Sequence, residues 1–307
     1  MDRHAYLIVA HNQWDLLKIL MRQLDDRRND IYLHVDMKSV DAPIEELKEV
    51  TKKSDVKIID RIPVHRGSFS LFEAEMDLLK EACENGEYTF FHMLSGQDLP
   101  LRDQDYIHEF FAENEGVNFV DVISPDSMNE EWRERVSLFQ LLSRQSLDNT
   151  WASVIAKGIR KITSHFQRML HVDRFSKYEK QGFSLCFGSN WFSITRSFAG
   201  YLIENESLIR QMFEKYTFAP EELIPQTFLW SSEFRDTLYN SEELDHGLHR
   251  ANLRLVFWNG KTSPETITMK HMDQIRTSTN LFARKFDYEN HPDAVEAVID
   301  MVNSGGH

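Results

Sequence analysis

Residues 91–101 read FHMLSGQDLPL and define one edge of the predicted fold. The apolar run from residue 88 to residue 94 predicts a buried strand, which stops at Ser95 and the Gly-Gln-Asp that follows. Pro100 then prevents a simple continuation of that strand. Because open α/β sheets bind their ligands at the carboxyl ends of the strands, Ser95, Gln97 and Asp98 are candidate ligand contacts.

Strand-like and helix-like segments alternate along the first 125 residues. Strands are predicted at residues 5–10, 31–35, 56–59, 88–94 and 117–123, and helices at residues 13–24, 43–52, 69–83 and 104–112. This alternation predicts a mostly parallel sheet covered by helices on both faces. The second half is less regular but contains no Pro/Gly linker and no internal repeat, so we predict one continuous domain over residues 1–307.

Composition disfavours nucleic-acid-binding, membrane-spanning and disulfide-rich classes of protein. The chain has 307 residues and a net charge of -14, which disfavours nonspecific binding to nucleic acid because a polyanion would be repelled. No run approaches the ~18 apolar residues that a membrane span needs. The apolar run before His11 is too short for a signal sequence. Cys83 and Cys186 are the two cysteines and do not form a disulfide framework.

Three further motifs accompany the first: HVDMKS at 34–39, APEELIPQT at 219–227 and LFARKFD at 281–287. Together the four motifs resemble those of the core-2/I-branching β-1,6-N-acetylglucosaminyltransferases and peptide O-xylosyltransferases. The resemblance implies a GT-A-type α/β fold, with a Rossmann-like, mostly parallel central sheet flanked by helices. It places a nucleotide-binding half at about residues 1–125 and an acceptor-binding, catalytic half at about residues 126–290.

The same resemblance implies a reaction. The expected activity is an inverting, single-displacement transfer of a sugar from a UDP-sugar to a hydroxyl of a glycan or lipid-linked saccharide. N-acetylglucosamine is the first choice of donor sugar, ahead of xylose or another hexose. The family is independent of metal ions, so no cofactor and no metal site are expected.

Two adjacent glutamates follow Pro220 in the third motif. By itself, a proline followed by acids is a common helix start, where negative side chains complement the helix dipole. The family's Ser-Pro-Asp-Glu ends in the catalytic base, so the resemblance gives that role to Glu222 and puts Glu221 in place of the aspartate. Pro225 is a departure that is expected to distort the following helix. It keeps open a second hypothesis, a catalytically silent module that binds nucleotide or glycan.

The leaving diphosphate needs positive charge. Lys285 matches the family's Lys-Phe-Asp, and Arg254, in LRLVFWNG, matches a second cation, so both are expected to bind the diphosphate. A rival hypothesis is a metal-dependent transferase that uses Asp103 and Asp105, which form an Asp-any-Asp match. Asp103 stands before a predicted helix, however, where an aspartate naturally serves as N-cap.

The remaining site residues are assigned by position and resemblance. His11 and Asp36 follow the first two strands, and His65 and Arg66 lie in a segment that resembles the one that closes over uracil and ribose in relatives; these four are the expected nucleoside contacts. For the acceptor and the sugar we expect Ser95, Gln97, Asp98, Trp191, Glu131 and Arg133. Instead of contacting the sugar, Trp191 could be a core residue. Glu131 and Arg133 could simply belong to a charged surface helix.

One basic segment stands out from the acidic chain. Residues 151–174 hold five basic residues and one acidic residue, with apolar residues at helical spacing. Either this is an ordinary surface helix with a solvated face, or it is a helix that rests on an anionic bilayer. Because membrane anchors and the many cysteines of animal relatives are missing, we expect a bacterial-type cytoplasmic protein, peripheral at the inner face of the membrane if the second reading holds.

Overall fold

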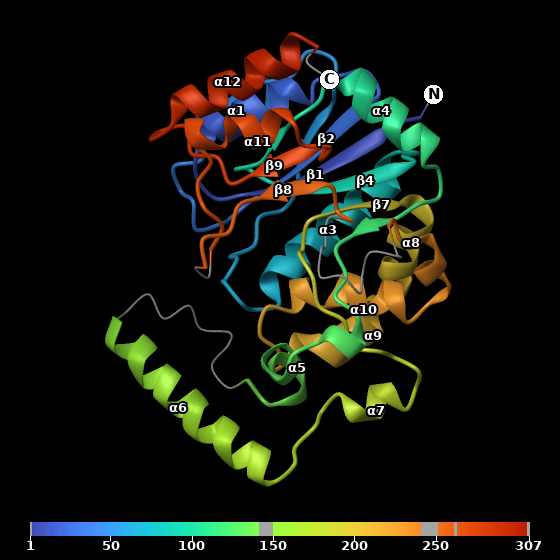
Figure 1. The fold of residues 1–307 in the computed structure, drawn as a ribbon, viewed down its shortest axis with the longest axis vertical. Helices are drawn as coiled ribbons and strands as arrows, with labels where there is room; N and C mark the ends of the chain where they lie inside the picture. Colours follow the sequence, from blue (N-terminus) through green and yellow to red (C-terminus); the bar gives the residue numbers. More distant parts are fainter. Residues whose placement is uncertain (1, 141–149, 241–250, 261–262, 306–307) are drawn as a thin grey trace.

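The computed structural model describes residues 2–140, 150–240, 251–260 and 263–305. Its centre is a six-stranded sheet with the strand order β3-β2-β1-β4-β7-β6 (Figure 1). Four strands run parallel: β1 (His4–Ala10), β2 (Asn29–Val35), β3 (Val56–Ile58) and β4 (Phe90–Ser95). Strand β7 (Phe192–Thr195) is antiparallel to β4 and to β6 (Phe119–Val120).

Helices cover both faces of this sheet (Figure 1). On one face lie α1 (Trp14–Gln23), α4 (Gln104–Glu113), α11 (Met272–Arg276) and α12 (Pro292–Asn303). On the other lie α3 (Ser70–Asn85), α8 (Arg196–Glu204) and α10 (Ile224–Trp230). Strand β1 alternates accordingly, with Leu7 and Val9 in one apolar cluster and Tyr6 and Ile8 in the other. The predicted mostly parallel sheet flanked by helices is confirmed.

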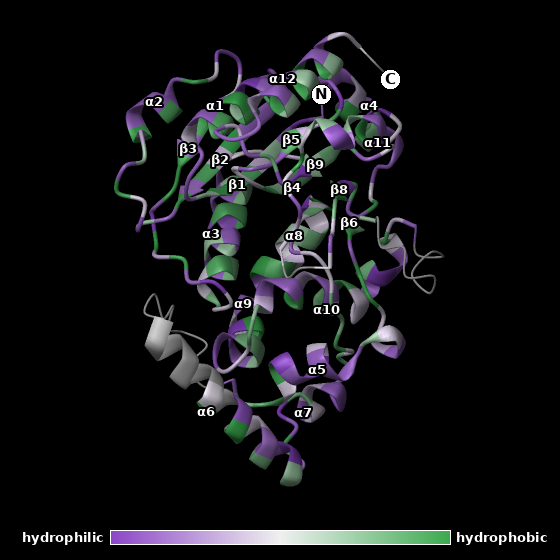
Figure 2. Cartoon of the chain, turned by 60° about the vertical axis from the view of Figure 1, so that its left-hand side comes forward, coloured by the Kyte–Doolittle hydropathy of each residue, from purple (hydrophilic) through white to green (hydrophobic). Residues whose placement is uncertain are grey.

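Three short helices lie at the far end of the molecule: α5 (Glu130–Ser137), α7 (Ser176–Glu179) and α9 (Glu206–Ile209). The 20-residue helix α6 (Thr150–Met169) lies at the same end. Figure 2 shows polar residues spread over this end as well as over the loops around the sheet. No helix in the described part of the chain combines the length and the apolar character needed to cross a bilayer.

The sequence did not predict a second, three-stranded sheet, with the order β5-β9-β8. It consists of β5 (Leu99–Pro100), β9 (Phe282–Arg284) and β8 (Arg254–Val256). Strand β4 ends at Ser95, and the chain turns before Pro100, which is itself part of β5 and pairs antiparallel with Phe282 of β9. Strands of two or three residues are too short to produce a periodic pattern, which explains why they were missed.

The helix predicted at residues 43–52 is shorter in the structure, where α2 spans Ile44–Lys48. The carboxylate of Asp25 accepts hydrogen bonds from the backbone N–H groups of Lys52, Lys53 and Ser54 at 2.8–2.9 Å. Those amides therefore bond to a side chain from a neighbouring loop instead of continuing the helix.

Three buried histidines lie between β1, β4 and α4. His4 stacks on His108 with ring centroids 4.0 Å apart, and His92 Nε2 is 3.1 Å from His4 Nδ1. Burial lowers the pKa of His4 and His92 well below the usual value. The rings are therefore neutral members of the core that hydrogen-bond to one another.

Gly188 lies where two distant segments meet and has no room for a side chain. A Cβ atom at this position would lie 1.8 Å from the backbone oxygen of Asp121. The N–H of Gly188 also donates to the carbonyl oxygen of Glu222 at 2.9 Å. Any displacement of Gly188 therefore moves the backbone of residue 222.

We predict that Gly188→Ala destabilises the fold by about 1–3 kcal/mol, because the methyl group must displace backbone rather than a flexible side chain. Gly200 in α8 is a matched control, since a Cβ there meets nothing within 4 Å. Gly200→Ala is expected to stabilise the helix by up to about 1 kcal/mol. Urea unfolding of both variants measures this, and equal stabilities would contradict the prediction.

Candidate functional site

The first strands end together at one edge of the main sheet. Val9 is paired with Ser95, and Ala10 with Val35. The chain beyond these strands stays at the same edge, because Ser39 Oγ donates to the carbonyl oxygen of His11 at 2.6 Å. The carboxyl ends of β1, β2 and β4 therefore bring His11, Asp36 and residues 95–98 together, as the sequence predicted.

Asp36 organises the loop that follows β3. Its Oδ1 accepts hydrogen bonds from the backbone N–H groups of Lys38 at 3.0 Å and Val64 at 3.2 Å. The second bond ties residues 64–68 to the end of β2. Burial lowers the pKa of His11, and the positive charges of Lys285 and Lys38 act in the same direction against the opposing charge of Asp36.

The carboxyl-terminal motif returns to this same edge. The N–H of Phe286 donates to the carbonyl oxygen of Gln97 at 3.0 Å, and Gln13 Nε2 donates to Asp287 Oδ1 at 3.0 Å. These bonds hold Lys285 beside the ends of β1 and β4. Burial lowers the pKa of Lys285, and the neighbouring charges of Arg284 and Arg66 lower it further.

Arg284, the residue before Lys285, holds together several of the expected sugar contacts. Its Nε lies 3.2 Å from Asp98 Oδ1, and its guanidinium lies over the Trp191 ring at 4.2 Å. Asp98 also accepts from the N–H and the hydroxyl of Ser95, both at 2.8 Å. Trp191 is 8% exposed, and Arg284 covers one face of the indole, so that face is not open for stacking on a sugar.

The two adjacent glutamates lie in a short 3-10 turn, η3 (Pro220–Glu222), which follows Ala219 in the left-handed conformation at φ 50°. Pro225 occupies the first turn of α10, where proline is tolerated, so the expected distortion of that helix does not occur. Glu222 projects from the turn toward α5. Its Oε2 accepts a hydrogen bond from Arg135 at 2.5 Å.

Arg135 is held in place by two aromatic rings, Phe187 at 5.0 Å and Phe218 at 5.6 Å from its guanidinium carbon. Such cation–π contacts fix a guanidinium without using its hydrogen-bond donors. Sequence analysis did not single out Arg135 for this role, because nothing local links residue 135 to residue 222. The structure shows it as the immediate partner of the candidate base.

The loop that contains Arg66 packs against the turn of the glutamates. Gly67 has φ +74°, and a Cβ there would lie 2.3 Å from the Phe218 ring. The carbonyl oxygen of Gly67 accepts the N–H of Ala219 at 3.1 Å. Arg66 itself is exposed, and its charge acts on both Lys285 and Glu221. Arg66 therefore lies between the carboxyl-terminal lysine and the glutamate turn.

Arg254 lies elsewhere. Its side chain is buried and donates to the carbonyl oxygens of Met93 and Phe192 at 3.4 and 2.7 Å, to the carbonyl of Asn252, and to Ser193 Oγ at 2.9 Å. These acceptors direct the guanidinium into the joint between the two sheets. The expected contact with a diphosphate therefore gains no support from its position.

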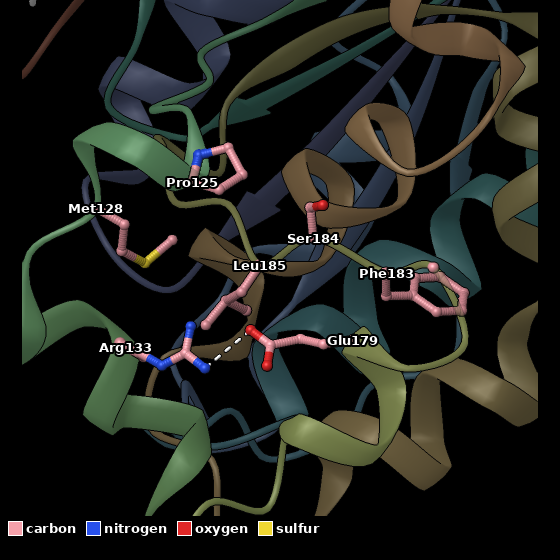
Figure 3. Close-up of a pocket in the computed structure, with 8 residues that line it drawn as sticks. Pro125, Met128, Arg133, Glu179, Phe183, Ser184 and Leu185 are labelled. Atoms are coloured by element: carbon pink, nitrogen blue, oxygen red, sulfur yellow. Dashed lines mark hydrogen bonds and ion pairs between the residues drawn. The ribbon is translucent and has the colours of Figure 1, made fainter.

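The two expected acceptor contacts on α5 separate in the structure. Glu131 is exposed, whereas Arg133 pairs with Glu179 at 2.8 Å (Figure 3). Arg133 also pairs with Asp173 at 3.0 Å. Arg133 and Glu179 line a cavity of about 330 Å³. The other residues that line it are Pro125, Met128, Gly182, Phe183, Ser184 and Leu185.

The Asp-any-Asp match lies at the opposite edge of the sheet. Asp103 Oδ1 accepts the N–H of Tyr106 at 2.8 Å, which confirms its predicted role as N-cap of α4. Asp105 pairs with Arg28 at 2.7 Å, and Arg28 directly precedes the amino end of β2. Asp36, by contrast, follows the carboxyl end of that strand. Asp103 and Asp105 are therefore separated from the candidate site by the length of the sheet.

A buried pair of carboxyl groups lies behind the glutamate turn. Glu75 on α3 accepts from Asn190 Nδ2 at 3.1 Å, while Glu75 Oε2 and Glu221 Oε2 have no hydrogen-bond partner in the described chain. Burial raises the pKa of Glu221 to about 8, and burial together with the charge of Glu221 raises that of Glu75. The sequence held one clue: Glu75 occupies the same helical stripe as Phe72, Met76 and Leu79.

We predict that Glu221→Gln changes how stability depends on pH. The unfolded chain loses the Glu221 proton near pH 4.5, whereas the folded protein keeps it to about pH 8. In this interval the folded state binds more protons, so the wild type loses stability as the pH rises, by at most about 1.4 kcal/mol per pH unit for this group. The variant lacks this loss, and Glu75→Gln is expected to act with the same sign.

Urea unfolding of the wild type and the Glu221→Gln variant at several pH values between about 5 and 8 tests this prediction. The difference in the free energy of unfolding should shift in favour of the variant as the pH rises. A difference that stays constant across the interval would show that Glu221 is already ionised in the folded protein.

Comparison with known proteins finds relatives that are named xylosyltransferases. Xylosyltransferase 2 of Rattus norvegicus is 25% identical over 264 residues, which cover 84% of this chain and 27% of the relative. Xylosyltransferase 1 of Homo sapiens is 23% identical over 266 residues, covering 84% and 24%. The chain thus spans about a quarter of the length of these curated relatives.

Among solved structures, apo mouse xyloside xylosyltransferase 1 shares 9% identity with a TM-score of 0.37, over 82% of this chain and 93% of that one. The family model for the Core-2/I-Branching enzyme matches residues 4–279, which is nearly the whole chain. The match includes the first three motifs and ends just before the carboxyl-terminal one. On the strength of that match, the chain belongs to the core-2/I-branching enzyme family.

Proposed function

We propose that this chain is an inverting, metal-independent glycosyltransferase that moves a sugar from a UDP-sugar to a hydroxyl of a glycan or lipid-linked saccharide. One observation carries the proposal. The charge of Arg66 acts both on Lys285, beside the ends of β1 and β4, and on Glu221, the neighbour of Glu222, and Gly67 packs against Phe218 and Ala219 just before the glutamate turn. Family membership supports the same reaction class.

In the proposed reaction Glu222 is the general base. Its Oε1 has no hydrogen bond to a described residue, while Oε2 stays bonded to Arg135. Oε1 takes the proton of the acceptor hydroxyl as that oxygen forms a bond to the anomeric carbon of the donor sugar. The bond from that carbon to the diphosphate oxygen breaks on the opposite face, and UDP leaves with the bonding electrons.

The leaving UDP needs positive charge, and this structure offers two cations for it. Lys285 is fixed by the backbone bonds on either side of it, and Arg66 is exposed next to it. Fixed cations can stabilise the developing charge of a diphosphate without a metal ion. We therefore assign this role to Lys285 and Arg66, and assign Arg254 to the joint between the sheets.

The nucleoside is proposed to bind between His11, Asp36 and His65, at the ends of β1 and β2. A neutral imidazole at His11 can accept or donate a hydrogen bond, and the Asp36 carboxylate, although buried, can accept one from ribose or uracil. Asp36 already holds the loop of residues 64–68 through Val64, so a bound nucleoside would contact a loop that is ordered before binding.

Two donor sugars, N-acetylglucosamine and xylose, are the candidates for this enzyme. N-acetylglucosamine is the sugar expected from the sequence resemblance, whereas the relatives are named xylosyltransferases. The rival metal-dependent enzyme is disfavoured because Asp103 and Asp105 lie at the far edge of the sheet. The catalytically silent module loses its main support, because Pro225 begins α10 instead of distorting it.

We predict that Glu222→Gln lowers kcat by about 10²–10⁴-fold, the usual contribution of a general base. Glutamine keeps an oxygen for Arg135 but cannot take the proton, so the affinity for UDP should stay within a factor of two or so. UDP release from UDP-xylose and UDP-N-acetylglucosamine, with UDP titration by calorimetry, measures both. Glu130→Gln, at an exposed position of α5, is the matched control and should behave as wild type. Full activity of Glu222→Gln would remove the proposed base.

We predict that Lys285→Ala in the presence of a chelator lowers kcat/KM by about 10–10³-fold, because a cation near the leaving group is lost. UDP should also bind more weakly. Asp105→Ala is the control and should keep its activity, since Asp105 lies on the opposite edge beside Arg28. Activity that requires added manganese and disappears in Asp105→Ala would instead establish the metal-dependent mechanism.

A further inference from the structure

Helix α6 is attached to the rest of the molecule through its polar face. Gln167 accepts the N–H of Phe139 at 2.6 Å and donates to the carbonyl oxygen of Phe139 at 3.2 Å. Arg168 forms a two-point ion pair with Glu134 of α5, at 2.5 and 2.6 Å. Figure 1 shows α6 set apart from the helices that cover the sheet. The last turn of the helix is therefore anchored by hydrogen bonds and an ion pair.

The apolar side of the same helix points to solvent. Its large apolar residues are 40–75% exposed and follow helical spacing: Ile159, Ile162, Phe166, Met169 and Leu170. An amphipathic helix of a globular protein normally buries this stripe against the core. From residue 159 onward the stripe of α6 is instead open to solvent, which is unusual for an ordinary surface helix.

The charge of the segment indicates what could cover the stripe. Residues 151–174 contain five basic residues and one acidic residue, while the whole chain has a net charge of -14. Arg168 is paired with Glu134, and Arg174 donates to backbone carbonyls of the protein body. The attraction to an anionic surface therefore depends on the other three basic residues, Lys157, Arg160 and Lys161. The positive charge of this segment would attract an anionic surface, whereas the acidic remainder would be repelled from it. A symmetric contact between two copies of α6 would place two positively charged segments together, which costs free energy.

We propose that α6 is an interfacial helix that binds the chain to an anionic phospholipid bilayer. Its axis lies in the plane of the interface, and the exposed stripe enters the boundary between headgroups and acyl chains. Basic residues of the segment meet the anionic headgroups. The anchoring contacts of Gln167 and Arg168 remain on the side of the protein body. This inference does not depend on the proposed reaction.

Cosedimentation with vesicles tests the proposal, using phosphatidylcholine alone and phosphatidylcholine with phosphatidylglycerol. The wild type should bind the anionic vesicles and bind neutral ones more weakly. Ile162→Glu with Phe166→Glu should reduce binding at least about tenfold, because two apolar contacts become charged. Replacing Lys157, Arg160 and Lys161 by glutamine should weaken binding about fivefold per cation on anionic vesicles only.

The matched control is Trp258→Glu with Met269→Glu, two exposed apolar residues outside α6 that receive the same added charge. It should bind vesicles as the wild type does, and circular dichroism should show the same fold in all variants. The proposal is overturned if the wild type binds neither kind of vesicle, or if the variant at residues 162 and 166 binds as well as the control. Self-association that is lost in that variant, without vesicle binding, would assign the stripe to a second copy.

Discussion

The buried guanidinium of Arg254 joins the two sheets of this molecule. From β8 it donates to carbonyl oxygens of Met93 in β4 and Phe192 in β7, and it lies over the ring of Phe282 in β9 at 4.8 Å. Hydrogen bonds from a charged donor contribute about 1.5–3 kcal/mol each, and they also satisfy a charge that would be costly to bury alone. Because β8 is paired with β9, this contact also keeps β9 beside β4. Lys285 directly follows β9 and is therefore held at the edge where β1 and β4 end.

A second close contact joins the two halves of the candidate site. The chain can approach the Phe218 ring at Gly67 because no side chain stands there, and the left-handed φ of that residue suits glycine. The loop from Asp36 to Arg66 and the turn that ends in Glu222 therefore form one packed unit. A nucleotide that orders the loop would act on the position of the base through this packing, without touching the base itself.

The first half of the fold could be predicted from sequence, whereas the joint between the sheets could not. Strand β1 is a largely apolar run of seven residues, and α3 carries a helical period over 16 residues; the structure has both within a few residues of the predicted bounds. The second sheet has strands of two or three residues, which leave no period to detect. The role of Arg254 could not be predicted from sequence either. A motif match does not show whether a guanidinium binds a ligand or donates to four acceptors of its own chain.

Two adjacent glutamates in the sequence do not show which of them is available to a substrate. The structure distinguishes them by environment: Glu221 is buried beside Glu75, and burial raises its pKa to about 8, whereas the side chain of Glu222 is 35% exposed and forms the ion pair with Arg135. Two ionised carboxylates at successive positions would repel each other, so a neutral Glu221 leaves the negative charge to Glu222. Because the rings of Phe187 and Phe218 hold Arg135 independently, the guanidinium can orient that charge while the other carboxylate oxygen takes a proton. The buried pair behind the turn thus supports the proposal that Glu222, and not Glu221, is the base.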